Sequence, residues 1–80
     1  MWEEKEYLIN YDSNSPKKTM RVVCLVNSPE VIILCAELWD FHRNEPIKEL
    51  QLKSYAEREC VKNLVSQEYS RKCVVKIKDE

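Results

Sequence analysis

The 80-residue chain contains no glycine, although an average composition would supply about six in a chain of this length. Glycine adopts positive φ without steric cost and lets a backbone approach a ligand closely. Phosphate-binding loops, dinucleotide-binding fingerprints, nucleophile elbows and EF-hand loops all depend on it. The sequence therefore excludes these sites, and it also excludes the glycine-containing motifs of KH and RRM domains.

Long apolar runs and an export signal are also missing. The longest apolar run, residues 31–36, is too short to span a bilayer. The acidic start, residues 1–6, lacks the apolar region of a secretory signal. We therefore expect a cytoplasmic protein whose four cysteines are reduced thiols.

The size and the charge balance of the chain narrow the possibilities further. Hydrophobic residues make up 44% of the sequence and charged residues 34%, which is typical of a folded chain. We expect one domain, residues 1–80, near the size at which a single core is marginal. The formal net charge of −1 gives no overall attraction to nucleic acids or anionic membranes, so such binding would have to be local.

Two strands are predicted in the first third of the chain. Residues 6–11 alternate with period two, and residues 20–26 are apolar on both faces, which predicts a central strand. A segment rich in turn formers, residues 12–18, separates them. The side chains expected to point inward are Tyr7, Ile9, Tyr11, Met20, Val22, Cys24 and Val26.

Residues 28–43 fit two different structures. Ser28 and Pro29 are a good helix start, Asn44 is a good helix stop, and the apolar residues between them share one broad helical face. Against this, the β-branched run over residues 31–34 favours a strand. We favour a helix over residues 29–43. The alternative is a hairpin that turns at residues 27–30.

The second half of the chain predicts a short strand over residues 47–53, a helix, and a last strand. Ser54 and Glu57 form a capping box that starts the helix, and Glu59 and Lys62 make an exposed pair on it. The side chains expected inward are Ile47, Leu50, Leu52, Cys60, Val61, Leu64, Val65, Cys73, Val75 and Ile77.

Together these elements predict an α+β fold in which a small, mainly antiparallel four-stranded sheet is packed by one or two helices. The expected order is β-β-α-β-α-β. The alternative order is a β-meander followed by one helix and a last strand. Because glycine is absent, the turn positions that it usually fills should fall to Asn14, Asn27 and Asn44, at helix ends or in turns with positive φ.

The cysteines and the single histidine are the first candidates for chemistry. Successive cysteines are separated by 11, 25 and 13 residues, so none form the local pairs of a structural zinc site. We expect Cys24, Cys35, Cys60 and Cys73 to be buried thiols, with a disulfide or a metal site as weaker alternatives. His42 lacks an orienting partner for acid–base work, and we expect it to complement a helix dipole instead.

Basic and aromatic residues are the candidates for binding. If the last strand lies beside the second, a basic stripe forms that is suited to phosphate contacts, although outward lysines also protect a sheet edge from aggregation. Its members are Lys17, Lys18, Arg21, Arg71, Lys72, Lys76 and Lys78. Large rings and carboxylates are the candidates for a protein partner, and the alternative for Trp39 is that it closes the core. These candidates are Trp2, Glu3, Glu4, Trp39 and Phe41.

These residues favour a non-enzymatic protein-binding module, without a cofactor or a metal, that is a monomer or a homodimer. One form of this role is an inhibitor, of the kind that phages and mobile elements encode, that covers the functional surface of a host enzyme such as a defence nuclease. Acidic residues 3–6 or 79–80 would then occupy a groove meant for nucleic acid. The alternative is a nucleic-acid-binding regulatory protein that uses the lysines of the last strand.

Overall fold

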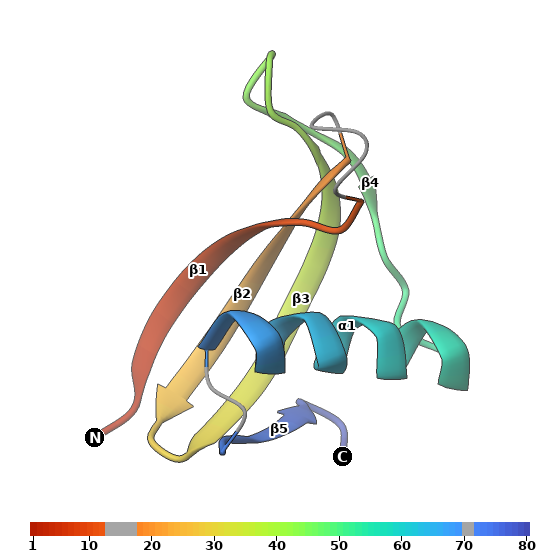
Figure 1. The fold of residues 1–80 in the computed structure, drawn as a ribbon. Coiled ribbons are helices and arrows are strands. Elements are labelled where there is room, and N and C mark those ends of the chain that lie inside the picture. Colours follow the sequence, from red (N-terminus) through yellow and green to blue (C-terminus); the bar gives the residue numbers. More distant parts are fainter. Residues whose placement is uncertain (13–17, 70–71) are drawn as a thin grey trace.

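The computed structural model describes residues 1–12, 18–69 and 72–80 and shows one helix packed on one sheet. Figure 1 shows the helix crossing one face of the curved strands. The elements in chain order are β1 (Glu3–Asn10), β2 (Thr19–Asn27), β3 (Glu30–Asp40), β4 (Glu45–Glu49), α1 (Tyr55–Tyr69) and β5 (Val74–Ile77).

Strands β1 to β4 form an antiparallel meander, and β3 is its organising strand. One edge of β3 pairs with β2 along its length. The other edge is shared, because β5 runs parallel to residues 30–33 and β4 runs antiparallel to residues 37–40. The predicted α+β class and antiparallel sheet are therefore confirmed, with β5 as a fifth strand.

The helix expected over residues 29–43 is wrong, and the alternative hairpin is correct. Ser28 and Pro29 form the turn between β2 and β3 rather than a helix start, and the peptide bond between them is cis. Residues 31–39 carry apolar side chains on both faces of a strand, so the same sequence also satisfies a helical period. Pairing with β2 decides between the two, because it buries Val31, Ile33 and Ala36.

The core lies between α1 and the sheet face that α1 covers, which we call the inner face. The four side chains of β2 that were expected to point inward do so, and each is at most 5% exposed. They are Met20, Val22, Cys24 and Val26. Val61 and Val65 of α1 pack against them. The buried hydrophobic residues of this face are Ile9, Met20, Val22, Cys24, Val26, Val31, Ile33, Ala36, Leu52, Val61, Val65 and Ile77.

Three of the residues expected inward are exposed. Ile47 of β4 is 63% exposed and Tyr11 is 38% exposed, because α1 does not extend over this end of the sheet. Cys60 is also exposed on α1. The short strand expected over residues 47–53 is in fact β4, which ends at Glu49.

Positive φ occurs at Asn44 and at Leu52 among the described residues, each with a φ of 55°. Asn44 confirms the expectation, although it ends the turn before β4 rather than a helix. Asn27 does not confirm it, because it ends β2 without a positive φ, and Asn14 lies outside the described residues. Leu52 was not expected there, since a bulky side chain at positive φ is costly.

The start of α1 explains why Leu52 adopts this conformation. The predicted cap is confirmed, since Ser54 Oγ accepts the N–H of Glu57 at 3.2 Å. The Glu57 carboxylate accepts the N–H of Leu52 at 2.6 Å rather than returning to Ser54 as in a regular capping box. The Arg58 guanidinium donates to the Leu52 carbonyl at 2.7 Å, so both backbone groups of Leu52 are held by the first turn of α1.

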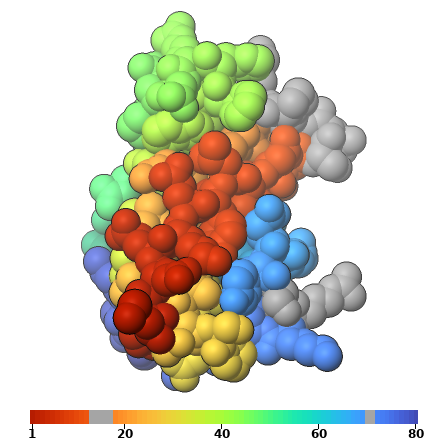
Figure 2. Space-filling model, turned by 90° about the vertical axis from the view of Figure 1, so that its left-hand side faces the viewer, coloured from red at the N-terminus to blue at the C-terminus, as the bar shows by residue number. Residues whose placement is uncertain are grey.

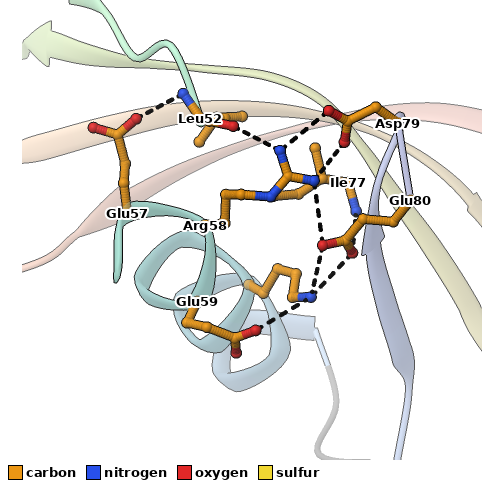
Figure 3. A network of polar contacts seen from close by, with 8 residues as sticks. Leu52, Glu57, Arg58, Glu59, Ile77, Asp79 and Glu80 are labelled. Carbon is orange, nitrogen blue, oxygen red and sulfur yellow. Dashed lines mark hydrogen bonds and ion pairs between the residues drawn. The ribbon is translucent and has the colours of Figure 1, made fainter. Parts of the chain in front are cut away.

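Arg58 and Lys62 also hold the C-terminal residues that follow β5 (Figure 3). Arg58 donates to Asp79 and Glu80, and Lys62 donates to both Glu80 carboxylate oxygens at 3.0 and 3.1 Å. Lys62 also pairs with Glu59 at 3.5 Å, as predicted. The carboxylates of Asp79 and Glu80 thus join β5 to α1, and we call these two residues with Arg58 and Lys62 the C-terminal clamp.

The clamp predicts a loss of stability in acid. Hydrogen bonding to Arg58 lowers the pKa of Asp79, and hydrogen bonding to Lys62 lowers the pKa of Glu80. A carboxyl whose pKa is lowered by folding stabilises the protein above its ordinary pKa, which is 4.5 for Glu80. That stabilisation disappears as the pH falls through the lowered value.

We expect Glu80→Gln to lower the free energy of unfolding at pH 7, and the difference from wild type to shrink toward zero as the pH falls below about 4. Urea unfolding followed by circular dichroism at several pH values measures this. Glu3→Gln, which removes an exposed carboxylate without an ion pair, should change little at any pH. A Glu80→Gln deficit that persists unchanged in acid would contradict the clamp.

Candidate functional site

The turn between β3 and β4, residues 41–44, projects beyond the part of the sheet that α1 covers (Figure 1). Asp40 Oδ1 accepts the backbone N–H groups of His42 and Arg43, each at 3.0 Å. Asn44 closes the turn at positive φ. Two hydrogen bonds to one carboxylate and a residue suited to its φ fix the shape of this tip.

Phe41 stands out on the tip because it is 61% exposed. Its ring lies edge-on to the His42 ring, with centroids 6.4 Å apart. The two rings border a shallow pocket of about 320 Å³ whose other walls are Leu8, Asn10 and Thr19. The pocket therefore combines an exposed ring with strands β1 and β2.

A second hollow lies on the β4 side of the tip. It is lined by Asp40, His42, Arg43 and Ile47, and Ile47 supplies an exposed apolar side chain there. Arg43 contacts Glu45 at 3.8 Å. His42 thus lies between two hollows in a turn, and the expectation that it complements a helix dipole is wrong because no helix ends there.

Arg21 of β2 lies on the sheet face opposite α1, which we call the outer face. It donates to Glu6 at 3.1 Å and to Glu37 at 3.0 Å, and its guanidinium lies 5.7 Å from the centre of the Trp39 ring. The hydrogen bond to Glu6, and then that to Glu37, raises the pKa of Arg21. Arg21 is therefore part of a charged cluster within the sheet and not of a basic stripe.

Trp39 lies in this cluster and not in the core, so the interpretation that it closes the core is wrong. Its register partner on β2 is Thr19, which lies on the outer face because the residue after it, Met20, is buried on the inner one. The Trp39 indole N–H is buried and has no hydrogen-bond partner among the described residues. Arg21 covers the ring, and this contact leaves Trp39 half-buried.

The residues proposed to bind a protein partner fall at two separate places. Trp2 is 41% exposed at the start of β1, and Glu3 and Glu4 beside it are exposed. Glu3 aligns with Val26 and hence with Val31, whereas Trp39 lies eight residues further along β3, about 27 Å at the usual strand rise. Trp2 and Phe41 are therefore too far apart to lie together at the centre of one compact partner surface.

The acidic segments are divided in the same way. Glu6 is paired with Arg21, and Asp79 and Glu80 are held by the C-terminal clamp. Glu3 and Glu4 form no ion pair within the described part of the chain. Of the acidic residues 3–6 and 79–80, only those at the start of β1 therefore have carboxylates without an ion pair in the described part of the chain.

The proposed basic stripe is not assembled as the sequence analysis required. Strand β5 pairs with β3 and not with β2. Lys18 pairs with Asp12 at 3.5 Å, and Arg21 is neutralised within its cluster. Lys17 and Arg71 lie outside the described residues. Lys72, Lys76 and Lys78 lie around β5 and are exposed.

The four cysteines form no disulfides and have different surroundings. Cys24 is buried, Cys35 and Cys73 are half-buried, and Cys60 is exposed, so the expectation of four buried thiols is correct only in part. Burial raises the pKa of the Cys24 thiol to about 12. Within residues 1–12, 18–69 and 72–80, no three His, Cys, Asp or Glu side chains come together in a way that would hold a metal ion.

An apolar groove between α1 and the uncovered end of the inner face was missed by the sequence analysis. Its volume is about 360 Å³, and the exposed Cys60 lies in it. The sequence contained one signal for this groove. Tyr11 and Leu50 were expected to point inward, at positions that a 15-residue helix cannot fully cover. The groove is lined by Tyr11, Met20, Leu38, Leu50, Ala56, Glu57, Cys60, Val61 and Leu64.

No family model, no curated protein and no solved structure matches this chain. Of the helices in the described residues, none has the length and apolar character needed to cross a bilayer. The function must therefore be inferred from the surfaces themselves.

The thiol environments predict a wide spread of reactivities. At pH 8 a disulfide reagent such as DTNB should modify Cys60 first and Cys24 only when the protein unfolds, because the thiolate is the reactive form and burial disfavours it. Cys60→Ser should remove the fastest phase of native labelling, whereas Cys24→Ser should leave that phase unchanged. Rapid native labelling of Cys24, identified by mass spectrometry, would contradict the packing of β2.

Proposed function

We propose that this chain is a non-enzymatic protein-binding module that contacts its partner with the tip of the β3–β4 hairpin. The observation that carries the proposal is Phe41, which is 61% exposed on a projecting turn. A ring in that position contributes nothing to the core. Aromatic side chains are enriched among the residues that dominate binding energy in protein interfaces.

The tip is preorganised for such a contact. Asp40 fixes the turn through two backbone hydrogen bonds, and Asn44 adopts the φ that the turn requires. A surface that is already ordered loses less conformational entropy on binding than a loop that must become ordered. The shallow pocket beside Phe41 supplies a complementary feature, because a partner side chain can enter it while Phe41 enters the partner.

The chemistry around Phe41 points to a mixed apolar and polar partner surface. Phe41 and Ile47 are exposed apolar groups on the two sides of the tip, and Arg43 and His42 add donors between them. An apolar centre with a polar rim is the common arrangement of protein interfaces.

We further propose that binding serves inhibition, with the projecting tip covering the functional surface of an enzyme. A narrow convex tip fits a concave site, and the exposed Glu3 lies where a basic rim of a nucleic-acid-processing enzyme would meet the far end of the sheet. A small inhibitor from a phage or another mobile element would work in this way. The lysines around β5 support the alternative of nucleic-acid binding less well, because Arg21 and Lys18 are paired with carboxylates.

The proposal predicts that Phe41→Ala abolishes capture of a stoichiometric partner from native host lysate. Truncating a central interface ring costs about 2 kcal/mol or more, which is roughly a thirtyfold loss of affinity. Tyr55→Ala is the matched control, because Tyr55 is 79% exposed on α1, away from the tip. Quantitative mass spectrometry of the captured proteins compares the three baits.

Equal capture by Phe41→Ala and wild type would contradict the proposal, as would equal loss with Tyr55→Ala. Salt-sensitive retention on DNA or RNA without a protein partner, lost when Lys72, Lys76 and Lys78 become Glu, would establish the alternative function instead.

A further inference from the structure

The outer face of the sheet carries a row of four cross-strand neighbours with opposite charges at its ends. Glu4 of β1 aligns with Leu25 of β2, Leu25 aligns with Ile32 of β3, and Ile32 aligns with Lys76 of β5. Aligned residues on neighbouring strands share one face of a sheet. The row therefore reads acidic, apolar, apolar, basic from one edge of the sheet to the other.

The apolar centre of this row is not covered. The one helix in the described part of the chain packs on the inner face, and Figure 2 shows it to one side of β1 with the sheet edge toward the viewer. Leu25 and Ile32 are only partly buried, as is Val23, two residues before Leu25 on β2. At the end of the sheet near them, Val74 is 50% exposed.

The two charged ends of the row are available for an external partner. Glu4 and Lys76 are exposed, and neither forms an ion pair within the described residues. In contrast, Glu6 and Arg21, which also lie on the outer face, satisfy each other. Within this row the unmatched charges therefore lie at opposite edges of the sheet, on either side of the apolar centre.

This arrangement is self-complementary in one face-to-face orientation. A two-fold axis parallel to the strands, between two outer faces, places the β1 edge of one copy over the β5 edge of the other. Glu4 then faces Lys76 of the second copy at both ends, and Leu25 faces Ile32 of that copy in the middle. An axis across the strands would instead place Glu4 over Glu4 and Lys76 over Lys76.

Edge-to-edge pairing through β1 is the competing way for two copies to associate. Three of the first four residues of β1 are acidic, namely Glu3, Glu4 and Glu6. Two β1 strands side by side would bring these carboxylates together, and like charges on an edge strand oppose such pairing. The charge pattern thus disfavours the edge and favours the face.

We propose that the outer face of the sheet binds a second copy of this chain, with Leu25 and Ile32 at the centre and a Glu4–Lys76 ion pair at each end. Two sheets packed in this way are aligned as in a β-sandwich, with about 10 Å between them. Phe41, in the turn that follows β3, lies nine residues beyond Ile32, about 30 Å at the usual strand rise, so the hairpin tip remains available. The dimer does not rest on the function proposed for the tip.

The test is a charge swap measured by sedimentation equilibrium on the full chain. The wild type should dimerise, and Lys76→Glu and Glu4→Lys should each weaken dimerisation about tenfold or more, because each replaces two attractive pairs with two repulsive ones. An equimolar mixture of the two variants should restore the dimer as a heterodimer, since every end pair is then again Glu opposite Lys. Restoration also shows that both variants are folded.

Lys5→Glu is the matched control, because it makes the same charge change on β1 but aligns with Cys24 on the inner face. It should leave the dimerisation constant unchanged. A wild-type chain that stays monomeric, a mixture that fails to restore association, or equal weakening by Lys5→Glu and Lys76→Glu would each overturn the proposal.

Discussion

The packing of α1, the one helix in the described residues, on the sheet is fixed at the start of this helix. This packing depends on Leu52. Leu52 has positive φ, which costs a residue of its type about 1–3 kcal/mol. Glu57 and Arg58 bind its two backbone groups, and its side chain is buried in the core. These interactions offset the cost in a chain that has no glycine to place there. Arg58 then reaches Asp79 and Glu80, so the same turn also holds β5.

A single docked helix leaves much of the sheet uncovered. Residues Tyr55–Tyr69 cover only part of the inner face and none of the outer face, and the β3–β4 hairpin extends past both. Without glycine the chain lacks the glycine-rich loops whose backbone surrounds a phosphate or nucleotide. The surfaces that remain are an exposed ring on a rigid turn and an apolar row with charged ends. Both features suit contact with another protein through side chains.

The sequence predicted those elements that carry no competing helix and strand signals. The inward side chains of β2 and the Ser54 cap of α1 are present as expected. The helix expected over residues 29–43 was wrong. Strand β3 is apolar on both faces, and such a segment fits a helix and a strand equally well until its partner strand is known. Similarly, the Arg21 cluster and the Glu4 to Lys76 row arise from the register between strands, which local sequence does not determine. The candidates Trp39 and Phe41 were expected on a helix, whereas Trp39 lies on β3 and Phe41 lies in the turn that follows it.

The most direct measurement of the binding role is site-specific photo-crosslinking in the native host cell. A photoreactive phenylalanine analogue at position 41 keeps the ring and reports what lies against the tip, and the same analogue at position 55 reports an exposed site on α1. The tip should yield one dominant crosslinked protein that position 55 does not yield. Identical products from both positions, or none from position 41, would contradict the role that we propose for the hairpin.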